Sequence, residues 1–242
     1  KGRGNFLKQS NKFDTTWGLS STSVSSGQSG YDGSTDAWIL NSTTTGSPRI
    51  QQTISQGGVS TFSVYAKAAT DDYIQLKTGG ISSEVWFNLS TGAVTNTAGD
   101  EYVDSNIISA GNGWYRCSVT FNGTISYLRI YPASAFGTYS TSGSGSFIQD
   151  AQLEQGLVAT DYIETTTEPL RAGILEDEPR FDYHNSASAS PNTCPSLLLE
   201  PSRTNLITNS EYFGGWTVNP LGGTVTRTPN ATTSPEGLEN AY

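Results

Sequence analysis

The stretch Trp114–Phe121, with the sequence WYRCSVTF, decides the fold class of this chain. Its positions alternate strictly: Tyr115, Cys117, Val119 and Phe121 occupy one phase, and Trp114, Arg116, Ser118 and Thr120 occupy the other. Because successive side chains of a β-strand point to opposite faces, this pattern predicts a strand with one buried and one solvated face. Cys117 stands in the apolar phase and is expected to be a small buried residue.

Further stretches of the same kind lie between residues 36 and 155, separated by clusters of Ser, Thr and Gly. They occupy residues 37–40, 48–55, 62–66, 73–77, 85–89, 127–131 and 147–153. The sequence contains no convincing amphipathic helix. Short strands at this spacing predict an all-β fold, an antiparallel jelly-roll β-sandwich over residues 5–163.

The composition agrees with an all-β protein and limits its partners. The chain has 242 residues, of which 63 are Ser or Thr and only 14% are charged. With 13 Lys and Arg against 22 Asp and Glu, the formal net charge is −9. Nucleic acids and anionic membranes bind basic surfaces, so neither is an expected partner. No apolar run approaches the roughly 18–20 residues of a membrane-spanning helix, so no membrane insertion is expected.

An internal repeat indicates how the chain is organised. The pattern Arg3-x-Asn5-Phe6-Leu7-x-x-Ser10-x-x-Phe13, followed by Trp17, returns as Arg203-x-Asn205-Leu206-Ile207-x-x-Ser210-x-x-Phe213, followed by Trp216. We therefore expect residues 205–242 to be the N-terminal part of a second, truncated module. Residues 164–204 are expected to be a connector, in which extended segments at 174–183 and 196–200 form a small hairpin.

Several stretches resemble known families. Thr61–Ala68 (TFSVYAKA) and Gly111–Arg116 (GNGWYR) resemble strands of the jelly-roll carbohydrate-binding modules attached to xylanases and cellulases. Ala151–Ile163 resembles a closing strand of bacteriophage virion proteins, and Pro179–Leu206 is similar to segments between modules of phage tail and fibre proteins. The resemblance implies a phage virion protein of the tail-fibre or tailspike type, at the tail or capsid surface. It also implies contacts with other virion subunits and a homotrimer.

The residues give little support to catalysis. His184 is the only histidine and stands in the connector, where we expect an exposed loop residue rather than part of a Ser-His-Asp triad. The acidic run Glu176–Glu178 also lies in the connector, where consecutive carboxylates are usually solvated, whereas a glycosidase needs two carboxylates across a cleft. We therefore expect that this chain is not an enzyme.

Binding of a glycan is the favoured alternative. Sugars are held by aromatic faces together with planar polar side chains. The strand faces opposite the aliphatic residues carry Tyr73, Gln75, Trp86, Asn88, Arg129 and Tyr131, which we predict as the carbohydrate-binding residues. The same side chains could instead pair across strands for stability or line a subunit interface. Trp38 and Trp114 are expected to be packing residues.

The resemblance also implies one structural Ca²⁺. The related carbohydrate-binding modules often hold a calcium ion with an Asp of the final strand as a ligand, and Asp150 falls near that position. The related modules usually have two acidic residues at that place, and this chain has Gln149 and Asp150 there.

These observations predict a non-catalytic virion structural protein whose jelly-roll module recognises host-surface polysaccharide. Two alternatives stay open. In the first, the module is a capsid or fibre spacer or decoration that binds no glycan. In the second, it is the targeting module of a larger polysaccharide depolymerase.

Overall fold

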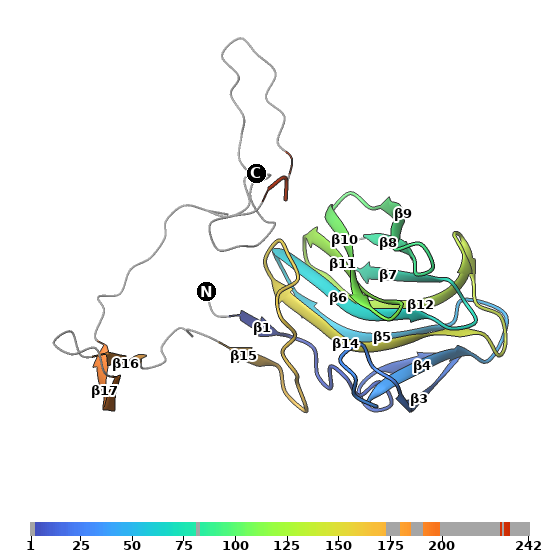
Figure 1. Cartoon of the computed structure of the whole chain (residues 1–242). Helices are drawn as coiled ribbons and strands as arrows, with labels where there is room; N and C mark the ends of the chain where they lie inside the picture. The colour runs from blue at the N-terminus through green and yellow to red at the C-terminus, as the bar shows by residue number, and fades with distance from the viewer. Residues whose placement is uncertain are drawn as a thin grey trace, which may run out of the picture.

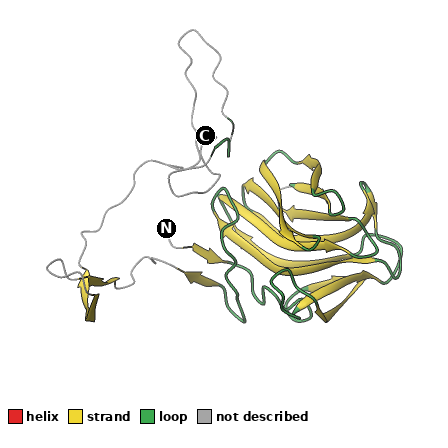
Figure 2. Ribbon diagram, in the orientation of Figure 1, coloured by secondary structure: helices red, strands yellow, loops and turns green. Residues whose placement is uncertain are grey.

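A computed structural model describes residues 3–80, 83–172, 180–184, 191–198, 228 and 230–232. Within these residues the fold is all-β and contains no helix (Figure 2). The strands are β1 (Arg3–Asn5), β2 (Gly18–Ser20), β3 (Thr22–Gln28), β4 (Ala37–Ser42), β5 (Arg49–Gln56), β6 (Val59–Ala68), β7 (Tyr73–Gly79), β8 (Glu84–Asn88), β9 (Ala93–Ala98), β10 (Tyr102–Gly111), β11 (Trp114–Asn122), β12 (Ile125–Ala135), β13 (Thr138–Tyr139), β14 (Gly145–Gln155), β15 (Leu170–Ala172), β16 (Arg180–His184) and β17 (Pro191–Leu198). No helix of the described residues is long and apolar enough to cross a membrane.

Two antiparallel sheets pack face to face, which confirms the predicted sandwich (Figure 1). The six-stranded sheet has the order β10-β11-β6-β14-β4-β3. The seven-stranded sheet has the order β2-β5-β12-β7-β8-β9, with β13 paired to β12. Strands that are far apart in sequence, such as β6 and β14, are neighbours, as the long crossings of a jelly roll require.

The core lies between the sheets and is built by the alternating apolar positions. The six-stranded sheet contributes Phe62, Val64, Ala66, Cys117, Val119, Phe121, Ile148 and Leu153, and the seven-stranded sheet contributes Ile50, Ile74, Leu76, Val85, Phe87, Leu128 and Ile130. Burial of Cys117 is confirmed, and it raises the pKa of the thiol because a thiolate would be desolvated there.

The segment between β1 and β2 is part of this core. Leu7, Phe13 and Trp17 are buried, and the Phe13 and Trp17 rings pack with their centroids 5.2 Å apart. The fully buried Asn5 donates through Nδ2 to the carbonyls of Ala151 and Ile163, and its Oδ1 accepts the backbone N–H groups of Leu7 and Leu153. The residues that recur in the internal repeat are therefore the ones that attach this segment to the sandwich.

All of the strands expected between residues 36 and 155 are present, but the sequence did not reveal several others. The strands that were missed include β3, β9 and β10, which lie at or near the edges of the two sheets. Trp38 and Trp114 are buried packing residues, as expected, at 7% and 1% exposure.

The described part of the expected connector contains β15, which pairs with β1 of the sandwich, and a β-hairpin. β16 and β17 pair antiparallel, with Arg180 opposite Leu198. His184 ends β16 opposite Pro191, so the expectation of a loop position was wrong for its backbone. The second extended segment begins at Pro191, earlier than predicted. The expected second module, residues 205–242, lies outside the described residues except for 228 and 230–232.

Candidate functional site

The predicted carbohydrate-binding residues all lie on the outer face of the seven-stranded sheet. Residues Tyr73 and Gln75 come from β7, Trp86 and Asn88 from β8, and Arg129 and Tyr131 from β12. Because β7 lies between β8 and β12, Gln75 stands opposite both Trp86 and Tyr131, and Tyr73 stands opposite Asn88. The strand register therefore brings these side chains together on one surface.

Two aromatic residues that the sequence analysis missed complete this surface. Tyr139 of β13 stacks between Trp86 and Tyr131, with ring centroids 5.4 and 5.0 Å away. The Tyr139 hydroxyl donates to Gln75 Oε1 at 3.0 Å. Phe136, in the turn between β12 and β13, packs edge-on against Trp86 with the ring centroids 5.6 Å apart. Phe136, Trp86, Tyr139 and Tyr131 therefore form a row of four aromatic rings, and the Gln75 side-chain amide bonds Tyr139 within it.

Three of the predicted residues are not solvated, which corrects the expectation of an open face. Gln75, Trp86 and Tyr131 are only 1%, 5% and 4% exposed. The turn of residues 133–139 folds back over them because β13 pairs with the end of β12. Phe136 at this turn is 50% exposed, so it is the ring of the row that solvent reaches most easily.

Half-buried polar side chains flank the row of rings. Asn88 Nδ2 donates to the Tyr73 hydroxyl at 2.9 Å. Lys77 and Glu84 form a salt bridge of 2.6 Å, and the hydrogen bond to Glu84 raises the pKa of Lys77. These groups are neighbours on β7 and β8, so the charge of Lys77 is paired and both strands offer hydrogen-bonding groups.

Arg129 joins this surface to the next strand, β5. Its Nε donates to Gln51 Oε1 at 2.6 Å, and its guanidinium lies 3.9 Å above the Tyr127 ring. Tyr127 in turn lies directly on Gly79, where a β-carbon would come within 1.8 Å of the ring. Only glycine at that position lets the ring lie flat on β7, which leaves its upper face to Arg129.

The opposite outer face, on the six-stranded sheet, is partly covered by the chain itself. Tyr31, from the loop between β3 and β4, stacks on Tyr65 with 3.6 Å between ring centroids and 4° between planes. Arg116 lies over the same Tyr65 ring at 5.3 Å and donates to Ser63 Oγ at 3.2 Å. Tyr65 and Arg116 are therefore engaged in packing on this face.

Asp150 lies where the resemblance placed a calcium ligand, but its carboxylate faces a tyrosine. It sits in a β-bulge of β14 with a φ of 53° and is 6% exposed. Its Oδ2 accepts the Tyr31 hydroxyl at 3.0 Å. Burial raises the pKa of Asp150 to about 7, and the nearby charges of Asp36 and Asp32 add to the effect.

The neighbouring acidic oxygens converge on an amide nitrogen. Gln149 Nε2 donates to Asp36 Oδ1 at 2.8 Å and to Asp32 Oδ1 and Ser34 Oγ at 3.3 Å. Calcium needs six to eight oxygen ligands around one point. No group of three or more His, Cys, Asp or Glu in the described residues could hold a metal ion. Calcium also accepts amide, hydroxyl and backbone carbonyl oxygens, so the assignment of Asp150 as a calcium ligand stays a prediction.

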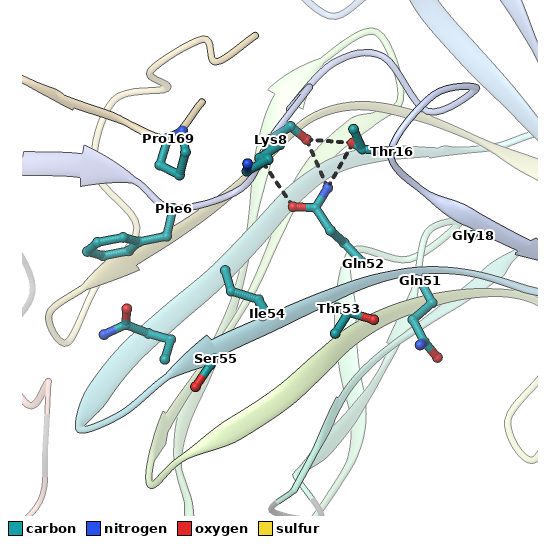
Figure 3. Close-up of a pocket in the computed structure, with 11 residues that line it drawn as sticks. Phe6, Lys8, Thr16, Gly18, Gln51, Gln52, Thr53, Ile54, Ser55 and Pro169 are labelled. Atoms are coloured by element: carbon teal, nitrogen blue, oxygen red, sulfur yellow. Dashed lines mark hydrogen bonds between the residues drawn. The ribbon is translucent and has the colours of Figure 1, made fainter. Parts of the chain in front are cut away.

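A groove of about 620 Å³ runs beside β5 (Figure 3). β2 pairs with β5 only at Arg49–Gln51, and no strand among the described residues flanks Gln52–Gln56 on that side. One end of the groove is closed by the Gln52 amide, which accepts Lys8 N–H at 2.9 Å and donates to Lys8 C=O at 2.8 Å. The groove is therefore a feature of an open sheet edge.

Comparisons with known proteins add little to this description of the site. No protein-family model matches the chain, and no curated protein matches it. One similar solved structure contains the N-terminal CBM22-1 and GH10 modules of endo-1,4-beta-D-xylanase 10B from Clostridium thermocellum, complexed with xylohexaose. The TM-score is 0.37 at 15% sequence identity, and the match covers 67% of this chain but only 29% of the xylanase chain.

Proposed function

We propose that this chain is a carbohydrate-binding protein without catalytic activity, and that polysaccharide binds at the outer face of the seven-stranded sheet. The observation that supports the proposal is the exposed Phe136 ring at the end of a stacked aromatic row. Sugar rings stack their apolar C–H faces on such aromatic rings. Tyr73, Asn88 and Lys77 lie within the same surface and supply hydrogen bonds to hydroxyl groups.

The buried rings have a supporting role in this proposal. Trp86 and Tyr139 fix the position of Phe136 before a ligand arrives, so little side-chain entropy is lost on binding. A weak individual site gains strength when several copies engage one polymer.

The finer form of the proposal concerns the biological setting. We propose that the polysaccharide is a host-surface glycan and that the chain belongs to a bacteriophage tail fibre or other virion appendage. Its support is the resemblance of Ala151–Ile163 and Pro179–Leu206 to segments of such proteins. A homotrimer would supply the multivalency, and light scattering on the purified chain tests that state directly.

The experiment is a glycan array probed with the full chain, displayed as a multimer to raise avidity. Phe136→Ala is the test variant, because Phe136 is half-exposed and its removal spares the core. Ile108→Ala is the matched control, since Ile108 is 57% exposed on β10 of the other sheet. We expect binding to fall about tenfold or more in Phe136→Ala and to be unchanged in Ile108→Ala. Equal binding by both variants would contradict this placement.

A structural spacer is the second candidate function. It is favoured by the burial of Gln75, Trp86 and Tyr131 beneath the chain's own turn, which is the arrangement expected if these side chains only stabilise the sheet. Absence of binding on a broad array at high valency would support this candidate over the first.

A further inference from the structure

The groove beside β5 has the chemistry of a second ligand site. Phe6, Ile54 and Pro169 give it an apolar wall, and Gln51, Thr53 and Ser55, which alternate with Ile54 along β5, point to the outer face of the strand and form the rim of the groove (Figure 3). The one lysine of the lining, Lys8, already forms a salt bridge of 3.2 Å with Glu168. The site therefore presents amides, hydroxyls and C–H surfaces, and its only charge is neutralised nearby.

The polar groups of the groove are available to a ligand. No residue in the described part of the chain bonds the hydroxyls of Thr53 and Ser55, and Gln51 uses only its Oε1, which accepts Arg129. Gln51, Thr53 and Ser55 are two residues apart along β5, so their side chains repeat on one side of the strand about every 6–7 Å. A regular row of this kind matches a polymer with regularly repeated hydroxyl groups.

The groove is also continuous with the surface proposed above. Gln51 lines the groove and is bonded to Arg129, and Arg129 Nη1 donates to the Tyr131 hydroxyl at 3.2 Å. Tyr131 stacks on Tyr139, which belongs to the aromatic row. A chain of direct contacts thus connects the Phe136 end of the surface with β5.

We propose that the groove beside β5 binds an uncharged oligosaccharide segment and extends the outer-face site, so that the protein holds the interior of a long glycan. This inference rests on the proposed function. An acidic glycan would meet Lys8, which is paired with Glu168, and Arg129, whose guanidinium is already held by Gln51, Tyr131 and Tyr127. A neutral glycan finds hydrogen-bonding partners and an apolar wall. Affinity should consequently rise with glycan length until both parts of the site are filled.

The test compares oligosaccharides of increasing length on the full chain. The probes are β-1,4-linked xylo-, gluco- and manno-oligosaccharides of two to six sugars, measured by calorimetry. Ser55→Trp places a large ring on the rim of the groove, over the row of Gln51 and Thr53, and Thr95→Trp places the same ring at an exposed position of β9, at the far edge of the sheet. For the wild type and Thr95→Trp, we expect affinity for the best hexasaccharide to exceed that for its trisaccharide at least tenfold. Ser55→Trp should lose that gain and keep the trisaccharide affinity.

The outcomes separate the two proposals. A length-dependent gain that survives in Ser55→Trp would overturn the groove proposal and leave the outer-face site standing. No binding of any probe by the wild type would overturn both for neutral glycans. An extended peptide such as (Thr-Val)₄ is the competing occupant, since the free edge of β5 could pair with a strand. Protection of the Gln52–Gln56 amides from hydrogen exchange by that peptide, and by none of the sugars, would also overturn the groove proposal.

Discussion

At the scale of single residues, Asp150 makes the stability of the protein depend on pH. Burial raises its pKa from 3.8 to about 7, so the folded state binds a proton that the unfolded state has released. The contribution of Asp150 to stability is therefore fully present below pH 4 and is lost as the pH rises through 7.

Replacement of Asp150 by asparagine should remove this dependence. We expect Asp150→Asn to match the wild type at pH 4 and to be more stable at pH 8, by on the order of 3 kcal/mol. Urea unfolding at pH 4, 6 and 8 measures the difference, with Asp14→Asn as the exposed control. A constant gap between wild type and Asp150→Asn over this range would show that the carboxyl is ionised throughout.

The sequence predicts which candidate residues share a face but not which of them solvent reaches. Period-two alternation is enough to place Gln75, Trp86 and Tyr131 opposite the core. Their burial depends on Phe136 and Tyr139, which follow the strand where the alternation stops. The only local signal is an aromatic residue directly before Gly137, whose φ of 74° marks a turn.

At the scale of strands, those with two neighbours were predictable and several at the margins were not. β6 and β11 bury one face against the core, so selection for apolar side chains leaves a clear alternation. β9, with the sequence AVTNTA, is almost wholly exposed and forms the edge of its sheet. The backbone of β9 pairs with β8, because the hydrogen bonds between strands join backbone groups and need no apolar side chains. No buried side chain of β9 therefore indicates a strand in the sequence.

The close approach of β14 and β4 gives a prediction at this scale. A β-carbon on Gly145 would lie 2.0 Å from the Leu40 carbonyl oxygen, so Gly145→Ala must push β4 away. We expect a loss of about 1–3 kcal/mol in the free energy of unfolding. Gly18→Ala is the control, because its nearest contact would be an ordinary 3.7 Å. Equal stability of the two variants in chemical denaturation would mean that the strands tolerate a wider spacing.

At the scale of the whole molecule, the segment before β2 is required for the sandwich to form. Leu7, Phe13 and Trp17 belong to the core, and Asn5 makes four hydrogen bonds, three of them buried, to residues of this segment and of 151–163. Loss of several large buried side chains costs about 2–5 kcal/mol each, which exceeds the stability of an ordinary domain.

We therefore expect a fragment of residues 18–172 to lack a cooperative thermal transition, whereas a fragment of residues 1–172 unfolds cooperatively. Circular dichroism during heating distinguishes the two. A sharp transition in the shorter fragment would show that the strand framework alone is sufficient.

The sequence predicts a second module from Arg203 onward because the residues that attach the first segment to the sandwich recur there.

The pairing of β1 with β15 places the start and the end of the sandwich side by side, with Arg3 opposite Ala172. Tension on the flanking chain would load these antiparallel pairs one at a time, from Arg3–Ala172 to Asn5–Leu170, so they would part in sequence at low force. Release of three residues on each side lengthens the chain by roughly 20 Å. The paired ends would thus act as a short extensible joint that yields before any pull reaches the packed sheets.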